Sequence, residues 1–284
     1  MTTILVTGGH GFIGQHVCRL LAARGHQPVV FDRQAHTTGP AILGDIRDSE
    51  AVTEAAAHCG AIIHLAGVLG TQETVGNPRP AAATNVLGGL NVLEAASQYD
   101  LPLVYIAVGN WWMDNAYSIS KTATERFCRM YRNDRNLNVS VVRAMNAYGP
   151  GQSLAAPWGP SKVRKIMPAF ICRALADQPI EIYGDGMQIM DMVYVTDVAE
   201  TLVGALGTNQ DWECGTGRAT TVLDIAEEVV RQVGKGTVVH LPMRPGEHPA
   251  SVVLADPAKM LRPASVSLED GTRETIEDIG IRLK

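Results

Sequence analysis

The chain has 284 residues, of which 46% are hydrophobic and 19% charged, so it can bury a sizeable core and is not a disordered segment. Its net charge of −5 argues against a general nucleic-acid binder, which needs a basic face. The five cysteines are scattered, without a Cys/His cluster at metal-ligand spacing, which predicts free thiols in a cytoplasmic protein and no metal site. We see no signal peptide and no apolar run near the roughly 20 residues of a membrane span, so no membrane partner is expected.

Short apolar runs alternate with longer helical patterns through the first half of the chain. Apolar runs bounded by helices are typical of a parallel sheet that is covered on both faces. We therefore predict an α/β fold with a Rossmann-type doubly wound parallel sheet. The expected elements, in chain order, are a strand at Ile4–Val6, a helix at Gly11–Arg24, a strand at Pro28–Phe31, a helix at Ser49–His58, a strand at Ala61–Leu65, a helix at Arg79–Gln98, a strand at Leu103–Val108, a helix at Asn115–Arg132 and a strand at Val139–Val142.

The pattern changes after Tyr148, where glycines and prolines interrupt the chain. We predict a dinucleotide-binding domain over residues 1–148 plus roughly 185–207. Residues 149–184 and 208–284 are expected to form a smaller C-terminal substrate-binding lobe. The later elements expected are helices near Lys165–Leu175, Thr196–Leu206 and Leu223–Val233, and a strand pair at Ile180–Tyr183 and Asp191–Val195.

A glycine-rich turn lies between the first predicted strand and the first helix. Gly8, Gly11 and Gly14 are spaced GxxGxxG, which lets the backbone turn tightly and approach a pyrophosphate at a helix N-terminus. Asp32 ends the second strand, where a carboxylate accepts ribose hydroxyls and repels a 2′-phosphate. The sequence therefore predicts binding of NAD rather than NADP, although the neighbouring Arg33 weakens that preference.

Two more segments are expected at the carboxyl ends of strands, where open α/β sheets bind ligands. They are Gly44–Ile46 and His64–Gly67. Asp45 is either a cofactor ligand or a helix cap, since Asp48 and a serine follow it closely. His64 is more consistent with a hydrogen-bonded strand-end histidine than with a catalytic one.

Tyr117 and Lys121 are four residues apart on a predicted helix and therefore share a face. A nearby ammonium favours a phenolate, so Lys121 is expected to lower the pKa of Tyr117 from about 10 toward neutral pH. Such a tyrosine can take a proton from a hydroxyl group as hydride leaves the same carbon. We interpret the pair as a general acid/base and its activator.

The motifs continue along nearly the whole chain, and the segments are Thr7–Gly14 (TGGHGFIG), Asp32, Gly44–Asp48 (GDIRD), His64–Gly67 (HLAG), Asn85, Tyr117–Lys121 (YSISK), Arg143–Pro150, Tyr183–Glu200, Arg244–Glu247 (RPGE) and Asp256. Together they resemble the extended short-chain dehydrogenase/reductase family, in particular its NAD-dependent nucleotide-sugar epimerase/dehydratase branch.

This resemblance implies chemistry through a transient keto sugar, with the cofactor reduced and then reoxidised in place. It implies that Tyr117 is the acid/base and that Lys121 also holds the nicotinamide ribose. It further implies that Asn146 touches the substrate and that Arg244 binds its diphosphate. The residues expected to contact NAD are Gly8, Gly11, Phe12, Ile13, Gly14, Asp32, Arg33, Asp45, Ile46, Leu65, Ala66, Gly67, Asn85, Tyr117 and Lys121.

The sequence departs from the family pattern at the end of the fourth expected strand. Relatives carry a serine or threonine there that hydrogen-bonds the reacting hydroxyl, whereas this chain has Val108. Asn110, Ser118, Ser120 or a water molecule could take its place. We name Asn110 as a substrate-binding candidate.

Two further departures concern the substrate. The stretch from Val108 to Tyr117 is short and lacks the Asp-Glu pair of a sugar 4,6-dehydratase, which disfavours that reaction. Met190 stands where relatives have an arginine, so one diphosphate contact is missing unless Lys162, Arg164 or Lys165 supplies it.

We predict an NAD-dependent nucleotide-sugar epimerase. One alternative is an NAD(P)-dependent reductase or dehydratase that acts on another polyol or nucleoside. A second is a non-catalytic NAD-binding sensor, in which Val108 records lost activity. The resemblance also implies a homodimer, joined through the long helices at Arg79–Gln98 and Asn115–Arg132, which otherwise simply cover the sheet.

Overall fold

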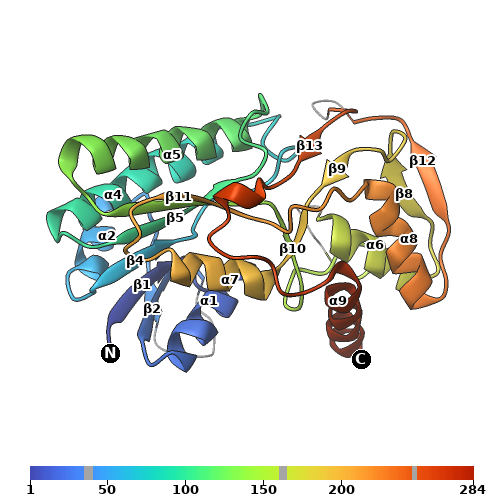
Figure 1. Cartoon of the computed structure of the whole chain (residues 1–284), viewed down its shortest axis with the longest axis horizontal. Helices are drawn as coiled ribbons and strands as arrows, with labels where there is room; N and C mark the ends of the chain where they lie inside the picture. The colour runs from blue at the N-terminus through green and yellow to red at the C-terminus, as the bar shows by residue number, and fades with distance from the viewer. Residues whose placement is uncertain (35–40, 160–164, 245–247) are drawn as a thin grey trace.

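A seven-stranded parallel sheet forms the larger part of the molecule (Figure 1). The computed structural model describes residues 1–34, 41–159, 165–244 and 248–284. The sheet has the order β11-β6-β5-β4-β1-β2-β3, and every neighbouring pair is parallel. Its strands are β1 (Thr3–Thr7), β2 (Gln27–Asp32), β3 (Ala41–Leu43), β4 (Ala61–His64), β5 (Leu103–Val108), β6 (Val139–Ala144) and β11 (Asp211–Cys214). The predicted Rossmann-type fold class is confirmed.

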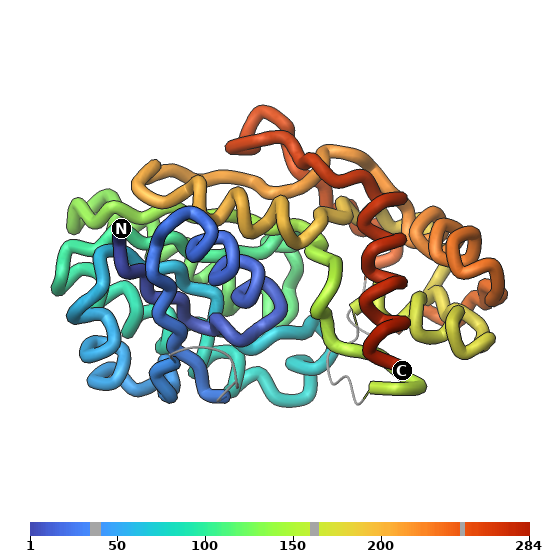
Figure 2. The backbone as a smooth tube through the Cα atoms, turned by 90° about the horizontal axis from the view of Figure 1, so that it is seen from below, coloured from blue at the N-terminus to red at the C-terminus, as the bar shows by residue number. Residues whose placement is uncertain are grey.

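Helices cover both faces of this sheet. One face carries α2 (Ser49–Ala56), α4 (Gly89–Gln98) and α5 (Ala116–Arg135), and the other carries α1 (Phe12–Ala23) and α7 (Val195–Gly204), which face the viewer in Figure 2. Successive strand side chains point to opposite faces, so Leu5 joins one apolar core and Ile4 and Val6 join the other. This two-sided burial explains why the central strands read as continuous apolar runs. No helix in the described ranges is long and apolar enough to cross a membrane.

The expected helix at Arg79–Gln98 is continuous but not uniform. It consists of α3 (Arg79–Ala81), a π-helical segment η1 (Ala82–Gly88) and α4. Within the π-helical segment the backbone carbonyl of Asn85 accepts a hydrogen bond of 2.6 Å from the hydroxyl of Thr124 on α5. A side-chain donor at that carbonyl is consistent with the wider turn.

The smaller lobe packs helices around short parallel strand pairs, at the right of Figure 1. Its helices are α6 (Ile166–Leu175), α8 (Val222–Val233) and α9 (Leu268–Arg282), with a 3-10 turn η2 at Pro257–Lys259. Strand β8 (Ile180–Tyr183) pairs with β12 (Val238–Leu241), and β9 (Ile189–Met190) pairs with β13 (Val252–Val253). Between the lobe and the large sheet, β7 (Asn146–Tyr148) pairs with β10 (Met192–Tyr194).

Three expectations about the second half of the chain were wrong. The strands at Ile180–Tyr183 and near Asp191–Val195 do not pair with each other, because each pairs with another segment. At the start of the segment 185–207, β9 and β10 lie outside the large sheet. Residues 211–214 were expected in the lobe, but they form β11, an edge strand of the large sheet.

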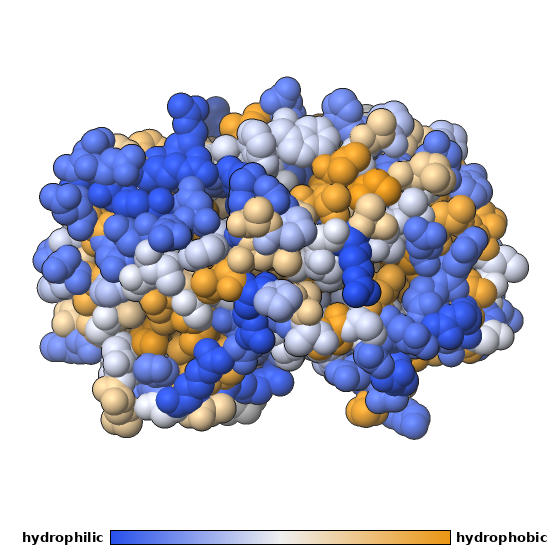
Figure 3. All heavy atoms as spheres, in the orientation of Figure 1, coloured by the Kyte–Doolittle hydropathy of each residue, from blue (hydrophilic) through white to orange (hydrophobic). Residues whose placement is uncertain are grey.

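Strand β11 was not predicted because two of its four side chains, those of Asp211 and Glu213, are charged, and only Trp212 and Cys214 pack against an apolar core. Asp211 binds Arg129 and Arg132 of α5 at 2.7 Å each, and Glu213 lies 3.9 Å from Arg143. These ion pairs replace apolar contacts at the sheet edge. Hydrophilic side chains accordingly gather over this part of the molecule in Figure 3.

A buried carboxylate joins the segments around β9. Asp191 is fully buried, and its carboxylate accepts hydrogen bonds from the Thr216 amide (2.7 Å) and hydroxyl (2.6 Å), the Gly217 amide (2.9 Å) and the Ala255 amide (3.1 Å). Its backbone carbonyl accepts from the amide of Asn146 at 3.0 Å. One residue therefore fixes three chain segments that surround the functional cavity described below.

We expect Asp191→Ala to lower the free energy of unfolding by about 3 kcal/mol, because it leaves several buried donors without an acceptor. Urea unfolding followed by circular dichroism measures this change. Asp134→Ala, at an exposed position of α5, is the matched control and should change the value by less than about 0.5 kcal/mol. Equal, small effects of both substitutions would contradict the role given to Asp191.

Candidate active site

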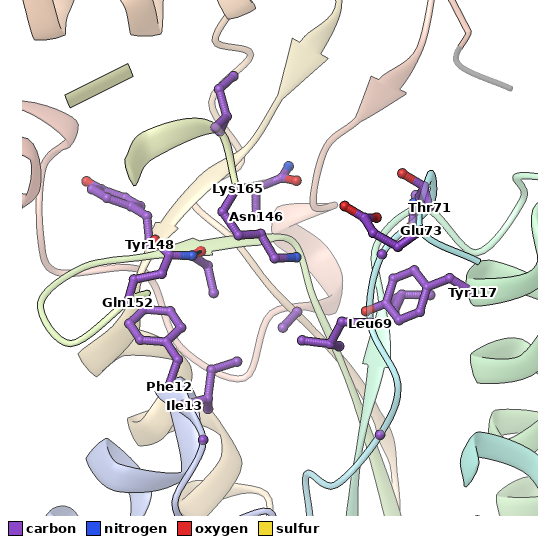
Figure 4. Close-up of a pocket in the computed structure, with 18 of the residues that line it drawn as sticks. Phe12, Ile13, Leu69, Thr71, Glu73, Tyr117, Asn146, Tyr148, Gln152 and Lys165 are labelled. Carbon is purple, nitrogen blue, oxygen red and sulfur yellow. Dashed lines mark hydrogen bonds between the residues drawn. The ribbon is translucent and has the colours of Figure 1, made fainter. Parts of the chain in front are cut away.

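One cavity of about 920 Å³ runs along the carboxyl ends of the central strands and continues into the smaller lobe (Figure 4). The residues that line it from the sheet side lie at or just beyond the carboxyl ends of β1 to β6. The lobe contributes residues of α6, β8, β9 and β10. The cavity is large enough for a ligand of drug size or greater.

The glycine-rich turn forms one end of this cavity. Gly8 has a φ of +71°, and a Cβ there would lie 2.8 Å from the backbone of Ala66. A Cβ at Gly14 would lie 2.3 Å from the carbonyl oxygen of Gly8. Helix α1 begins directly after Gly11, and it has no side-chain cap and no acidic residue in its first turn. Its first amides therefore face the cavity as donors for an anionic group.

Two carboxylates lie near the ends of β2 and β3. Asp32 accepts hydrogen bonds from the amides of His10 and Gln34, both 3.1 Å long, and lines the cavity. Asp45 lines it too, and the Arg47 guanidinium, which donates a hydrogen bond of 2.6 Å to its carboxylate, holds the pKa of that carboxyl below the usual range. Asp45 is not a helix cap, because Asp48 caps α2.

The remaining predicted cofactor residues divide into two groups. Leu65, Ala66 and Gly67 line the cavity, as Ile46 does. Asn85 does not: its amide oxygen accepts from Val68 N (2.7 Å), and its amide nitrogen donates to Val68 O (3.0 Å) and Ser120 Oγ (2.9 Å). We expected a cofactor contact at Asn85, but these buried bonds make it a bridge between the β4 loop and α5.

Tyr117 and Lys121 both line the cavity from the first turns of α5. Asn115 caps this helix by accepting a hydrogen bond of 2.9 Å from the amide of Ser118, which fixes where the helix starts and hence where Tyr117 lies. Lys121 is buried at 4% exposure.

The expected lowering of the Tyr117 pKa by Lys121 is not found. Burial raises the pKa of Tyr117 above its ordinary value instead of lowering it. Burial also lowers the pKa of Lys121 to about 7, partly offset by Cys128 and Glu125. The Lys121 ammonium lies over the ring of Tyr105, 4.3 Å from its centroid. The desolvation of both groups therefore outweighs their mutual effect.

Val108 is buried at the end of β5 and lines the cavity, at the position where the family pattern has a hydroxyl. Ser120 cannot replace that hydroxyl, because its Oγ donates to Tyr117 O (2.9 Å) and accepts from Asn85. Ser118 is fully buried and does not line the cavity. Asn110 does line it, so it stays a candidate beside water.

The lobe side of the cavity holds most of the substrate candidates. Asn146, Met190 and Arg244 line it, and the Arg244 guanidinium stacks over Tyr183, 4.2 Å from the ring centroid. Lys165 also lines it, and Figure 4 shows its side chain reaching from the lobe toward Tyr117. The other two cations proposed to offset Met190, Lys162 and Arg164, lie outside the described residues, as do residues 245–247 of the RPGE motif.

Sequence reasoning missed the polar side chains of the loop that follows β4. Thr71 and Glu73 line the cavity beside Tyr117, and Figure 4 shows the Glu73 carboxylate turned into it. Burial lowers the pKa of Lys165, whereas Glu73 raises it, so the two charges interact across the cavity. The position of this loop at a strand's carboxyl end was the available signal.

Comparison with known proteins agrees with this geometry. A family model described as the NAD dependent epimerase/dehydratase family matches residues 4–215. The crystal structure of UDP-glucose 4-epimerase from Thermus thermophilus in complex with NAD is 30% identical, with a TM-score of 0.86, and covers 98% of this chain and 99% of its own. UDP-glucose 4-epimerase from Thermotoga maritima with UDP-glucose is 28% identical, with a TM-score of 0.90 and coverage of 99% and 100%. A dTDP-4-dehydro-6-deoxy-D-allose reductase from Streptomyces bikiniensis is 28% identical over 88% of this chain and 87% of its own.

The lowered pKa of Lys121 predicts a pH-dependent stability. Between about pH 7 and its ordinary pKa of 10.5, the unfolded chain holds a proton at Lys121 that the folded protein lacks, so this residue makes stability rise with pH. Below about pH 7 Lys121 is protonated in both the folded and the unfolded protein, so the full cost of burying its ammonium lowers the stability of the fold. In nucleotide-free protein, Lys121→Met should therefore be more stable than the wild type near pH 6.5, by a margin that shrinks toward pH 9.

Urea unfolding at a series of pH values measures this margin. Lys235→Met, at an exposed position, is the control and should give a margin that does not vary with pH. A constant margin for Lys121→Met as well would show that Lys121 titrates normally in the folded protein.

Proposed function

We propose that this chain, which belongs to the NAD-dependent epimerase/dehydratase family, is an epimerase that inverts one carbinol carbon of a nucleotide-linked sugar. The observation that carries the proposal is that Tyr117 and Lys121 line the same cavity as the glycine-rich turn and the lobe residues. A dinucleotide and a sugar can thus meet at one tyrosine.

The residues at the sheet end of the cavity fit NAD. The uncapped start of α1 and the Gly8 turn suit its pyrophosphate, and Asp32 suits a ribose with a free 2′-hydroxyl. Phe12, Ile13, Arg33, Asp45 and Ile46 also line that end, and the Arg33 side chain is 63% exposed and lies 3.9 Å from the Asp45 carboxylate.

In the proposed reaction, NAD held at the glycine-rich turn and Asp32 would supply the hydride acceptor and donor for the sugar carbon. The phenolic oxygen of Tyr117 takes the proton of the sugar hydroxyl during oxidation and returns it to the carbonyl oxygen during reduction. Because burial raises the pKa of Tyr117, the phenol needs positive charge beside it before it can lose a proton near neutral pH. The Lys121 ammonium is the protein's source of that charge.

The lobe is proposed to hold the nucleotide-sugar substrate. Asn146 and Arg244 offer hydrogen bonds and positive charge at the cavity wall, and Lys165 adds a cation on the side where Met190 replaces an arginine. The keto intermediate must turn between hydride removal and return, and the volume of the cavity leaves space for that movement.

Val108 favours one alternative. A valine cannot hydrogen-bond the reacting hydroxyl, so an NAD(P)-dependent reductase or dehydratase with a different substrate is the second candidate, and the similarity to a reductase supports it. Net consumption of cofactor separates a reductase from an epimerase, whose cofactor ends unchanged.

We also propose that the protein is a cytoplasmic homodimer. Leu87 on η1 and Ile119 on α5 are 60% and 55% exposed, on the two helices expected to meet a second subunit. Both side chains are therefore accessible to a second subunit. All five cysteines are free thiols, in keeping with a reducing compartment.

The proposal predicts an isomer of unchanged mass, without net NADH, when the protein is incubated with NAD and a panel of UDP-, GDP- and dTDP-sugars. Mass spectrometry and NMR identify the product, and absorbance of the reduced nicotinamide is followed in parallel. Tyr117→Phe should lower turnover by at least about 100-fold while NAD binding changes little, since general acid–base catalysis contributes that much.

Tyr99→Phe, exposed at the end of α4, is the matched control and should keep wild-type turnover. Full activity of Tyr117→Phe would remove the acid/base assignment. Reduced sugar formed with stoichiometric loss of NADH or NADPH would favour the reductase instead.

A further inference from the structure

Three side chains form a row across neighbouring strands of the large sheet. Thr7 of β1 is the register partner of His64 of β4, and His64 is the register partner of Tyr105 of β5. All three residues are buried, with exposures of 0%, 2% and 1%. Lys121 of α5 lies at the end of this row, with its Nζ 4.3 Å from the centroid of the Tyr105 ring.

In the first contact of the row, His64 is neutral and hydrogen-bonded to Thr7. The hydroxyl oxygen of Thr7 accepts hydrogen bonds from the amides of Leu65 (3.2 Å) and Ala66 (3.3 Å), so its own proton is directed to Nδ1 of His64 at 2.7 Å. Burial, together with the charge of Lys121, lowers the pKa of His64 to about 3. The imidazole therefore adds no second positive charge beside Lys121.

The second contact joins the two rings and fixes Tyr105. The rings of His64 and Tyr105 lie 5.6 Å apart with a tilt of 35°. The Tyr105 hydroxyl donates a hydrogen bond of 3.0 Å to the backbone carbonyl of Lys121. The ring is thus held at both ends, by the sheet and by the helix that carries Lys121.

Within the described ranges, Lys121 forms no ion pair with a carboxylate, although it is buried. The acid one turn further along α5, Glu125, is engaged elsewhere: it binds Arg143 at 2.6 Å and Arg129 at 2.5 Å. A buried ammonium usually requires a partner. The face of the Tyr105 ring is that partner, at a distance typical of a cation–π contact.

We propose that Tyr105 is a positioning residue that holds the Lys121 ammonium by its ring face, so that the N–H donors of Lys121 remain available to Tyr117 and the nicotinamide ribose. A carboxylate in that place would occupy those donors and neutralise the charge that Tyr117 needs. The effect of this contact on catalysis rests on the proposed function, whereas the contact between Tyr105 and Lys121 does not.

The pKa of Lys121 depends on its contact with the Tyr105 ring and can be measured. The titratable groups that face it are His64 from β4, Tyr105 from β5, and Tyr117, Glu125 and Cys128 from its own helix. Of these, only the Tyr105 ring has its face against the ammonium. Removing the ring while keeping the burial leaves the ammonium less stable, and its pKa falls.

The test compares Tyr105→Leu with Tyr105→Phe, which keeps the ring and loses only the hydroxyl. The full-length protein, with its six lysines labelled with ¹³C at Cε, is titrated by NMR, and the Lys121 signal is identified by its loss in Lys121→Met. We expect the Lys121 pKa to fall by about 0.5 or more in Tyr105→Leu, and by clearly less in Tyr105→Phe. If Tyr105→Leu does not fold, Tyr105→Met fills more of the space without a ring.

Turnover and NAD binding are then measured as functions of pH. Tyr105→Leu should lose activity at a lower pH than the wild type, and Tyr105→Phe should restore most of the difference. In a Lys121→Met background, Tyr105→Leu should cause no further loss of NAD affinity. An unchanged Lys121 pKa in both ring-free variants would overturn the inference. A shifted pKa in a protein that is inactive on every nucleotide sugar would leave the inference intact and refute the proposed function.

Discussion

The parallel pairing of β1 with β2 and β4, and of β4 with β5, is the constraint on which the rest of the site depends. Because the strands run in one direction, the residues that follow each of them meet at a single edge. That edge collects the glycine turn after β1, Asp32 of β2, the loop after β4, and Val108 of β5. Helix α5 adds Tyr117 and Lys121, which line the cavity beside this edge.

Burial of charge is the second theme of the structure, and each buried charge is stabilised differently. Asp191 is held by amides and a hydroxyl from two other segments, and Glu125 by two arginines. Among the described residues Lys121 forms no ion pair, and its ammonium lies over the face of the Tyr105 ring, with Glu125 acting on it through space. Asp191 and Glu125 are thus suited to structural roles, whereas the proton on Lys121 remains easy to remove. A group with a pKa near 7 is the kind that enzymes use for proton and charge control.

The sequence predicted the fold class because the central strands are buried on both faces and the helices between them have normal length. It placed Tyr117, Lys121, Asp32 and the glycine turn on the cavity, since these follow from strand ends and helical spacing. It did not predict features that depend on specific contacts: the hydrogen bonds of Asn85 with Val68 and Ser120, and the ion pairs of the edge strand β11. The raised pKa of Tyr117 likewise depends on desolvation, which spacing along a helix does not reveal.

The central claim is that hydride leaves and returns to one sugar carbon inside this cavity. The most direct measurement uses the nucleotide sugar that is converted, deuterated at the carbon that inverts, in ordinary water with NAD. We predict that NMR finds the deuterium retained on the inverted carbon of the product. Deuterium lost to water, or deuterium held in accumulated reduced cofactor beside an oxidised sugar, would contradict the account.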